Sequence, residues 1–113
     1  MNFQHKELAQ GRWFEFSLME QLGNIGSEVS RAINWKNKGN QKYSWQAFER
    51  ALELIDLTIS DKKNLFRLKE IVRMREVLVD FFAGENQFKS SDTSWQKYFL
   101  QFAYAARKTS IKS

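Results

Sequence analysis

The stretch from Ser17 to Trp35 reads SLMEQLGNIGSEVSRAINW, and it decides the fold class. Its apolar residues return every three or four positions, which is the spacing of one face of an α-helix. At its start, the side chains of Ser17 and Glu20 can each accept a hydrogen bond from the other residue's backbone amide. The stretch therefore predicts an amphipathic helix over residues 17–35. Its expected buried residues are Leu18, Leu22, Ile25, Val29, Ala32 and Ile33.

Two glycines, Gly23 and Gly26, lie inside this helical pattern. A glycine in a helix costs about 1 kcal/mol relative to alanine, so two of them within four residues need a structural reason. We expect a second helix to approach closely at this edge, where no side chain stands in the way. A phosphate-binding loop is not indicated, because such a loop lies between a strand and a helix.

Three further stretches repeat apolar residues at helical spacing, and the chain contains no proline. The polar segment Asn34–Lys42 is the predicted first loop, after which Ser44 should cap the second helix. Residues 60–64 predict a tight turn, Gly84 a left-handed end to the third helix, and Thr93 the cap of the last. The residues expected to face inward are Phe48, Ala51, Leu52, Leu54, Ile55, Leu57 and Ile59, then Leu65, Leu68, Ile71, Val72, Leu78, Val79 and Phe82, and finally Trp95, Phe99, Phe102, Ala103 and Ala106.

Short connections between helices favour antiparallel neighbours. The sequence therefore predicts an all-α fold, an antiparallel up-down-up-down four-helix bundle. With 113 residues there is room for one domain and one core, so we expect a single domain over residues 1–113. Within it, residues 1–16 should form an N-terminal arm that packs its aromatic rings on the bundle or on a neighbouring subunit. Residues 108–113 should form a short basic tail.

The composition suggests classes of partner. A formal net charge of +5 favours an anionic partner such as nucleic acid. An aromatic fraction of 15% is large for four short helices, so some rings are expected at a subunit interface of a homo-oligomer. No apolar run reaches the roughly 18–20 residues of a membrane span, and no membrane partner is expected. The lack of cysteine fits a cytoplasmic protein.

Residues that carry catalysis are sparse. His5 is the one histidine and there is no cysteine, so neither a zinc-type site nor histidine-dependent catalysis is indicated. Glu49, Glu53 and Asp56 share one side of the second predicted helix. Such a row can hold a divalent cation, or it can form an ion-pair seam with the basic third helix, and we favour the seam. We predict no catalytic residue, no cofactor and no metal, and hence a protein that is not an enzyme.

The segment from Arg31 to Trp45 combines cations with flat rings and contains no acidic residue. Cations can hold phosphates while rings stack on unpaired bases. The expected nucleic-acid-binding residues are Arg31, Lys36, Lys38 and Lys42, which would contact phosphates, and Trp35 or Tyr43, which would stack. Basic residues in 62–67 and 107–112 would extend the same field if the fold brings them to one side. The alternative is a solvated loop whose tryptophans anchor it to the bundle.

The chain resembles a group of small four-helix-bundle proteins, those encoded in ribosomal RNA intervening sequences together with the accessory proteins of diversity-generating retroelements. The resemblance covers roughly residues 14–60. It rests on residues 16–22 (FSLMEQL), on Val29, Ala32 and Ile33, and, after a polar basic loop, on residues 48–54 (FERALEL). It implies an antiparallel bundle that forms a ring-like homo-oligomer, often a pentamer. For the retroelement proteins it also implies a basic protein that assists a reverse transcriptase and its RNA.

Two hypotheses of function follow from the sequence. The first is a non-enzymatic, homo-oligomeric bundle that binds RNA or DNA, alongside a nucleic-acid enzyme such as a reverse transcriptase. The second is a protein–protein adaptor or assembly module that docks a partner through exposed aromatic residues and has no role on nucleic acid. A third and weaker alternative is an enzyme that uses the acidic row of the second helix with a metal.

Overall fold

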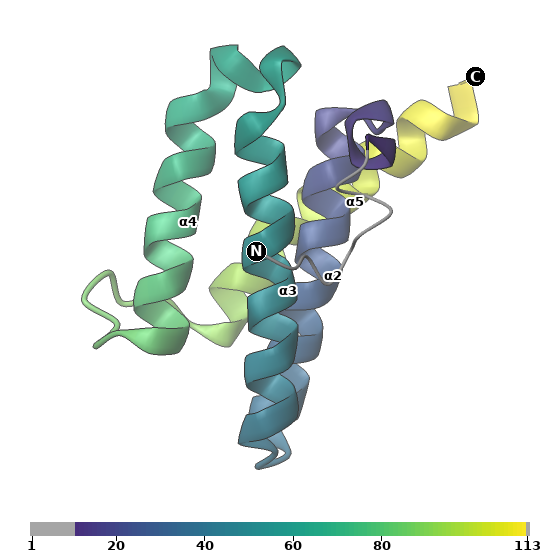
Figure 1. The fold of residues 1–113 in the computed structure, drawn as a ribbon. Coiled ribbons are helices and arrows are strands. Elements are labelled where there is room, and N and C mark those ends of the chain that lie inside the picture. Colours follow the sequence, from purple (N-terminus) through teal and green to yellow (C-terminus); the bar gives the residue numbers. More distant parts are fainter. Residues whose placement is uncertain (1–10, 113) are drawn as a thin grey trace.

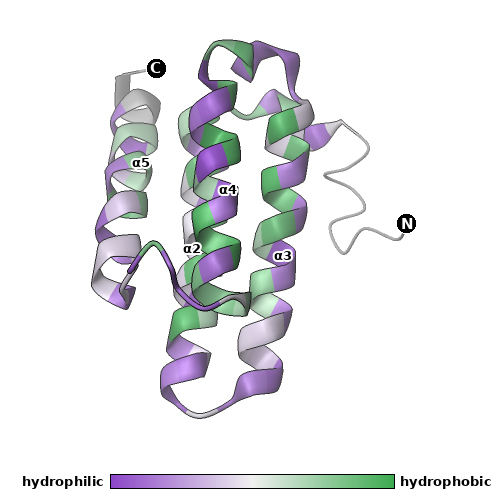
Figure 2. Cartoon of the chain, turned by 90° about the vertical axis from the view of Figure 1, so that its left-hand side faces the viewer, coloured by the Kyte–Doolittle hydropathy of each residue, from purple (hydrophilic) through white to green (hydrophobic). Residues whose placement is uncertain are grey.

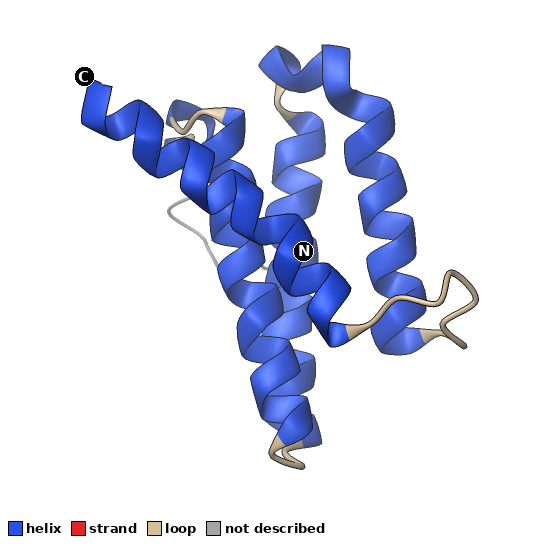
Figure 3. Cartoon of the chain, turned by 180° about the vertical axis from the view of Figure 1, so that it is seen from behind, coloured by secondary structure: helices blue, strands red, loops and turns tan. Residues whose placement is uncertain are grey.

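The computed structural model describes residues 11–112, which are helical and contain no strand (Figures 1 and 3). Four α-helices, α2 (Leu18–Asn37), α3 (Gln41–Ser60), α4 (Leu68–Ala83) and α5 (Asp92–Lys112), pack against one another. Two 3-10 helices, η1 (Arg12–Glu15) and η2 (Lys62–Arg67), precede α2 and α4. Successive α-helices alternate in direction (Figure 1). The predicted all-α four-helix bundle is therefore confirmed.

The helix α2 is the centre of the bundle. It packs along α3 on one side and against α5 on the other, whereas α4 packs chiefly on α3 and η2. Viewed from behind, α5 crosses α2 obliquely rather than lying alongside it (Figure 3). Because α4 and α5 have different supports, they scarcely touch, and the bundle is open between them.

The core lies between the facing sides of the four helices. Most residues that the sequence placed inside are buried, and the strip of hydrophobic residues along the helices contrasts with the hydrophilic tip where α2 meets α3 (Figure 2). Two predictions for the third helix are wrong. Leu65 is 65% exposed and Val72 is 46% exposed. Leu65 belongs to η2, whose tighter winding breaks the α-helical spacing, and Val72 lies on the outer side of α4. In α5, Ala103 is also exposed.

The first loop is shorter than predicted. The helix α2 continues to Asn37, and α3 begins at Gln41 because the Asn40 side chain accepts a hydrogen bond from the Tyr43 amide at 3.0 Å. Ser44 is not the cap. It is buried in α3 and its hydroxyl donates to the Ala32 carbonyl at 2.7 Å. The polar residues of 34–42 are mostly at the ends of α2 and α3, where side chains face water. Their polarity therefore reflected exposure and not a loop.

The ends of α4 and α5 also differ from the prediction. Gly84 has φ −107°, an extended conformation rather than a left-handed one. The next turn is held by Asp80, whose carboxylate accepts from the amides of Gln87 and Phe88 at 2.9 and 3.0 Å. The helix α5 starts at Asp92, one residue before Thr93. Its C-terminal part runs through residues 108–112, which were expected to be a tail.

A buried polar network fixes η1 to the bundle. Trp13 is 1% exposed and its indole N–H donates to the Thr58 hydroxyl at 3.0 Å. The Gln21 amide donates to the Trp13 carbonyl at 3.1 Å and to the Asp61 carboxylate at 2.9 Å. Asn64 in turn donates to the Gln21 side chain at 2.9 Å. Trp13 of the predicted arm therefore packs on the bundle of its own chain, which was one of the two predicted alternatives.

The glycine edge of α2 receives α5. A Cβ atom added to Gly26 would lie 2.6 Å from the Cβ of Phe99, a distance that side chains do not tolerate. One added to Gly23 would lie 3.5 Å from the Cα of Ala103, which is ordinary contact. The close helix approach predicted from the two glycines is confirmed, and it depends mainly on Gly26.

We predict that Gly26→Ala destabilises the protein by about 1–3 kcal/mol relative to Gly23→Ala, because the new methyl group forces Phe99 and α5 away from α2. Both substitutions share the same gain in helix propensity, up to about 1 kcal/mol, so the difference isolates the clash. Urea unfolding followed by circular dichroism measures it. Equal stability of the two variants would contradict the packing described here.

Candidate functional site

The tip formed by the end of α2 and the start of α3 carries part of the predicted nucleic-acid surface. Lys38, Lys42 and Tyr43 are exposed there. The ring of Trp35 meets Tyr43 edge-on, with centroids 5.0 Å apart, and the Lys38 ammonium lies 5.2 Å from the Trp35 ring. Within residues 11–112, neither Lys38 nor Lys42 makes an ion pair. At the tip, Lys38 and Lys42 therefore have no ion-pair partner among the described residues, and Tyr43 is 45% exposed.

The other two predicted phosphate contacts are engaged inside the molecule. Arg31 pairs with Glu28, a buried carboxylate that also accepts a hydrogen bond from Arg50 at 2.6 Å. Lys36 pairs with Asp92 at 2.8 Å, and its ammonium lies 4.3 Å from the ring of Phe81. Lys36 thus joins α2 to α5, and Glu28 joins Arg31 of α2 to Arg50 of α3. The sequence did not reveal the pairs between helices, because their partners lie 22 and 56 positions apart.

The remaining basic segments lie away from the tip. The helix η2, with Lys62 and Arg67, stands at the opposite end of α3, and Arg107 lies near the C-terminal end of α5 (Figure 1). The helix α3 has 20 residues and is therefore about 30 Å long. At physiological salt, charges act on one another over only about 8 Å. The fold therefore does not bring these segments to the side of the tip, which was the condition for them to extend its positive field.

The acidic row of α3 behaves in part as a seam. Asp56 pairs with Arg75 of α4 at 2.8 Å, which is the kind of contact expected for this row. Glu49 is exposed. In the described part of the chain, no group of three histidine, cysteine or acidic residues is placed to hold a metal ion.

A groove of about 500 Å³ runs between α2 and α5. Its α2 side, here called the floor, carries small residues such as Gly26 and Ser27. Residues of α5, among them Lys97, Phe99 and Leu100, line the other side, and Leu100 is 67% exposed. Tyr104, one turn further along α5, is equally exposed. The sequence carried the signal for the floor, since small and polar residues recur along one edge of α2, but not for the ridge that Leu100 and Tyr104 form beside it. The floor residues on α2 are Gly23, Gly26, Ser27, Ser30 and Asn34.

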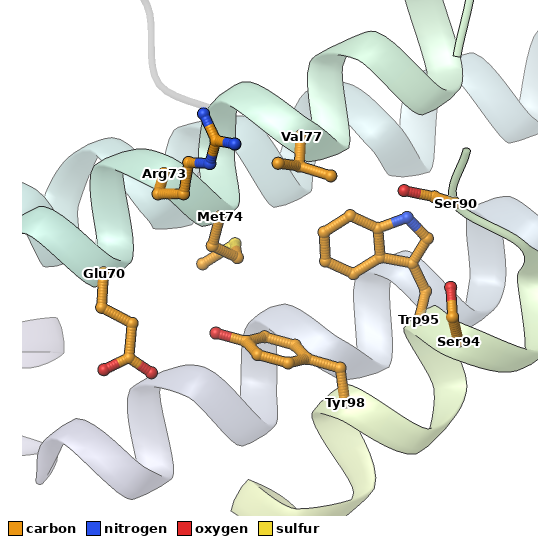
Figure 4. A pocket seen from close by; sticks show the side chains of 8 residues that line it. All are labelled: Glu70, Arg73, Met74, Val77, Ser90, Ser94, Trp95 and Tyr98. Carbon is orange, nitrogen blue, oxygen red and sulfur yellow. The ribbon is translucent and has the colours of Figure 1, made fainter. Parts of the chain in front are cut away.

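A second pocket, of about 370 Å³, opens between α4 and α5 (Figure 4). Met74 and Val77 of α4 face Trp95 and Tyr98 of α5 across it. Burial and the nearby carboxylate of Glu70 raise the pKa of the Tyr98 phenol to about 12, so this hydroxyl stays protonated at neutral pH. Sequence reasoning missed the pocket because it forms only where α4 and α5 diverge.

Comparison with known proteins gives no assignment. No family model, curated protein or solved structure matches the chain. No helix in the described part is both long enough and apolar enough to cross a membrane. The functional conclusions below therefore rest on the geometry of the tip, the groove and the pocket.

We predict that Lys36→Met lowers the free energy of unfolding at neutral pH and makes this free energy depend less on pH in the acid range. The hydrogen bond from Lys36 comes first among the causes that hold the pKa of Asp92 below its usual value. A depressed pKa stabilises the folded state above the unfolded value of about 4, and this contribution is lost as the pH falls through the folded value. The pair is one-third exposed on each side, so we expect less than about 1 kcal/mol.

Urea unfolding of both proteins between pH 2.5 and 7 provides the measurement. The matched control is Lys38→Met, which removes a cation that has no ion pair in residues 11–112. A Lys36→Met profile parallel to that of the unmodified protein across this range would show that the pair contributes nothing.

Proposed function

We propose that the protein is a non-enzymatic assembly module whose copies join through the groove between α2 and α5. The observation that carries the proposal is the pairing of a ridge with a groove on one face. Leu100, which lines the groove, and Tyr104, one turn further along, are exposed on α5, and the α2 side of the groove contains small residues such as Ser27 and Ser30. Large apolar side chains left in water next to a concave surface are typical of interaction sites.

A second copy of the chain fits this face because the ridge and the groove are neighbours. In a twofold arrangement, Leu100 of each copy would enter the groove of the other, so a single surface satisfies both partners. The small residues of the floor allow the backbone of an incoming helix to come close. The ridge lies along α5, which has 21 residues and a length of about 30 Å.

A standard interface would take only a small part of the surface that this chain exposes. A specific interface buries about 800 Å² on each partner, and the chain exposes 7395 Å², so roughly one-ninth of it would be needed. Burying a side chain such as Leu100 contributes about 1.5–3 kcal/mol relative to leaving it in water. Two such residues on each copy supply a substantial part of a stable association.

We predict that the protein elutes as a homo-oligomer and that Leu100→Ser combined with Tyr104→Ser converts it to a monomer. Size-exclusion chromatography with light scattering measures the mass. The matched control is Leu65→Ser combined with Phe66→Ser, which removes two apolar residues of η2 that are 65% and 81% exposed. A monomeric unmodified protein would overturn the proposal and favour an adaptor for a different protein. If only the control variant became monomeric, the interface would lie at η2 instead.

Contact with nucleic acid at the tip is a second candidate function. Lys38 and Lys42 are free of ion pairs within the described residues, and Tyr43 is 45% exposed beside them. Together with the net charge of +5, this arrangement supports binding of a single strand, with the lysines on phosphates and the ring on a base. Arg31 and Lys36 are not among the proposed nucleic-acid-binding residues, because each already forms an ion pair inside the protein.

We predict that Lys38→Glu combined with Lys42→Glu weakens binding to a single-stranded RNA oligonucleotide. It should also reduce the slope of log K against log salt by about 1.4, which is the release expected for two phosphates. Fluorescence anisotropy in a salt series measures both. Lys62→Glu combined with Lys69→Glu makes the same change of net charge elsewhere and should have little effect. An equal loss in the two double variants would mean that only total charge matters, and no measurable binding would remove this candidate.

A further inference from the structure

The pocket between α4 and α5 exists because the two helices rest on different partners. The helix α4 is held by α3, and α5 is held by α2, so their facing sides diverge instead of packing. The space between them is about 370 Å³ and opens to solvent. Pockets that bind small molecules measure about 300–1,000 Å³, so this volume suits a compound of one or two fused rings.

The inner wall of this pocket is apolar and aromatic. Met74 and Trp95 are each 5% exposed, and Val77 completes the wall on the α4 side. The rings of Trp95 and Tyr98 meet at 87° with centroids 5.7 Å apart, so they form a corner (Figure 4). A flat ring can lie against one face of such a corner while it meets the edge of the other ring, and both geometries are favourable. The shape therefore selects planar molecules.

Two hydrogen-bond donors of the corner lack partners. The Tyr98 hydroxyl points into the pocket toward Met74 and Glu70 and makes no hydrogen bond within residues 11–112 (Figure 4). The indole N–H of Trp95 is buried and has no acceptor in that part of the chain. The cost of a buried donor without an acceptor, about 1–3 kcal/mol, applies to the Trp95 N–H, which lies on the side of Ser90 (Figure 4). The Tyr98 hydroxyl instead faces the pocket, so an occupant that supplies an acceptor would gain a hydrogen bond there, whereas a purely apolar occupant would not.

The charges at the rim are already engaged. Glu70 accepts hydrogen bonds from Arg67 at 2.8 to 3.0 Å. The Arg73 guanidinium turns away from the pocket (Figure 4) and stacks 4.5 Å from the ring of Phe88. Transfer of a charged ligand into this site would therefore lack an ionic partner and carry a desolvation penalty. The rim favours an uncharged ligand.

We propose that this pocket binds an uncharged, planar aromatic molecule that accepts a hydrogen bond from the Tyr98 hydroxyl, with its ring held in the corner between Trp95 and Tyr98. The acceptor is a ring nitrogen or a carbonyl oxygen. The Val77 and Met74 side chains cover the opposite face of the ring. This site is separate from the tip and from the groove between α2 and α5, and it does not require either proposed function.

The test compares two ligands of the same shape. Quinoline is a neutral two-ring compound with one acceptor nitrogen at pH 7.5, and naphthalene lacks the acceptor. We expect quinoline to bind with a Kd below about 1 mM and about two- to tenfold more tightly than naphthalene. Titration followed by amide and indole proton–nitrogen NMR spectra should shift the Trp95 indole signal, with smaller shifts of the signals from Trp13, Trp35 and Trp45.

Two substitutions locate the contact. Tyr98→Phe should lower the affinity for quinoline to that for naphthalene and leave naphthalene unchanged, since only the hydroxyl is lost. Val77→Trp should fill the pocket and abolish binding of both, whereas Val72→Trp places the same bulk on the exposed side of α4 and should have no effect. Should Val77→Trp fail to fold, the shift map of the unmodified protein and the Tyr98→Phe titration still decide. No shift at Trp95, equal affinity for the two ligands, or unchanged affinity for quinoline in Tyr98→Phe would overturn the proposal.

Discussion

The close contact between α2 and α5 at Gly26 determines most of the surface features of this protein. Phe99 occupies the space where a side chain of residue 26 would otherwise stand, and α5 is thereby held across α2. Because α5 crosses α2 obliquely, it cannot also lie against α4 (Figure 3). The groove on one side of α5 and the pocket on the other are both consequences of this crossing.

The end of the bundle opposite the tip is held by polar groups rather than by apolar ones alone. Burial of Asp61 opposes its ionisation, but hydrogen bonds from Lys63 and Gln21 outweigh that effect and lower the pKa of the carboxyl. Gln21 and Asn64 connect this carboxylate to η1, α2 and η2. A network of this kind specifies a unique arrangement because each member loses its partner if another moves. It explains how a short 3-10 segment before α2 is fixed in place.

The sequence predicted the helices and the inner face of α2, because apolar spacing and the Ser17–Glu20 cap are local properties of the chain. It did not predict which cations are free. Lys36 and Lys42 look alike in sequence, yet among residues 11–112 only Lys36 meets an acid, and that acid lies 56 residues away. The pocket was missed for a related reason, since Trp95 has the spacing of a core residue and only the divergence of α4 leaves room beside it. Helices can be predicted from local patterns, whereas a site depends on contacts between residues that are distant in sequence.

The abundance of aromatic residues has two structural explanations rather than one. Four rings of α5, those of Trp95, Tyr98, Phe99 and Phe102, contact one another in series, and Phe99 reaches the core because Gly26 makes room for it. The core therefore holds more rings than four short helices would ordinarily admit. Among the described residues, the large rings and aliphatic side chains that remain outside lie at the tip, on η1 and η2 and on the outer face of α5, with one each on α4 and the loop after it. An exposed Tyr104 adds nothing to the internal packing of one chain, which is why the proposed contact between copies uses it together with Leu100 beside it.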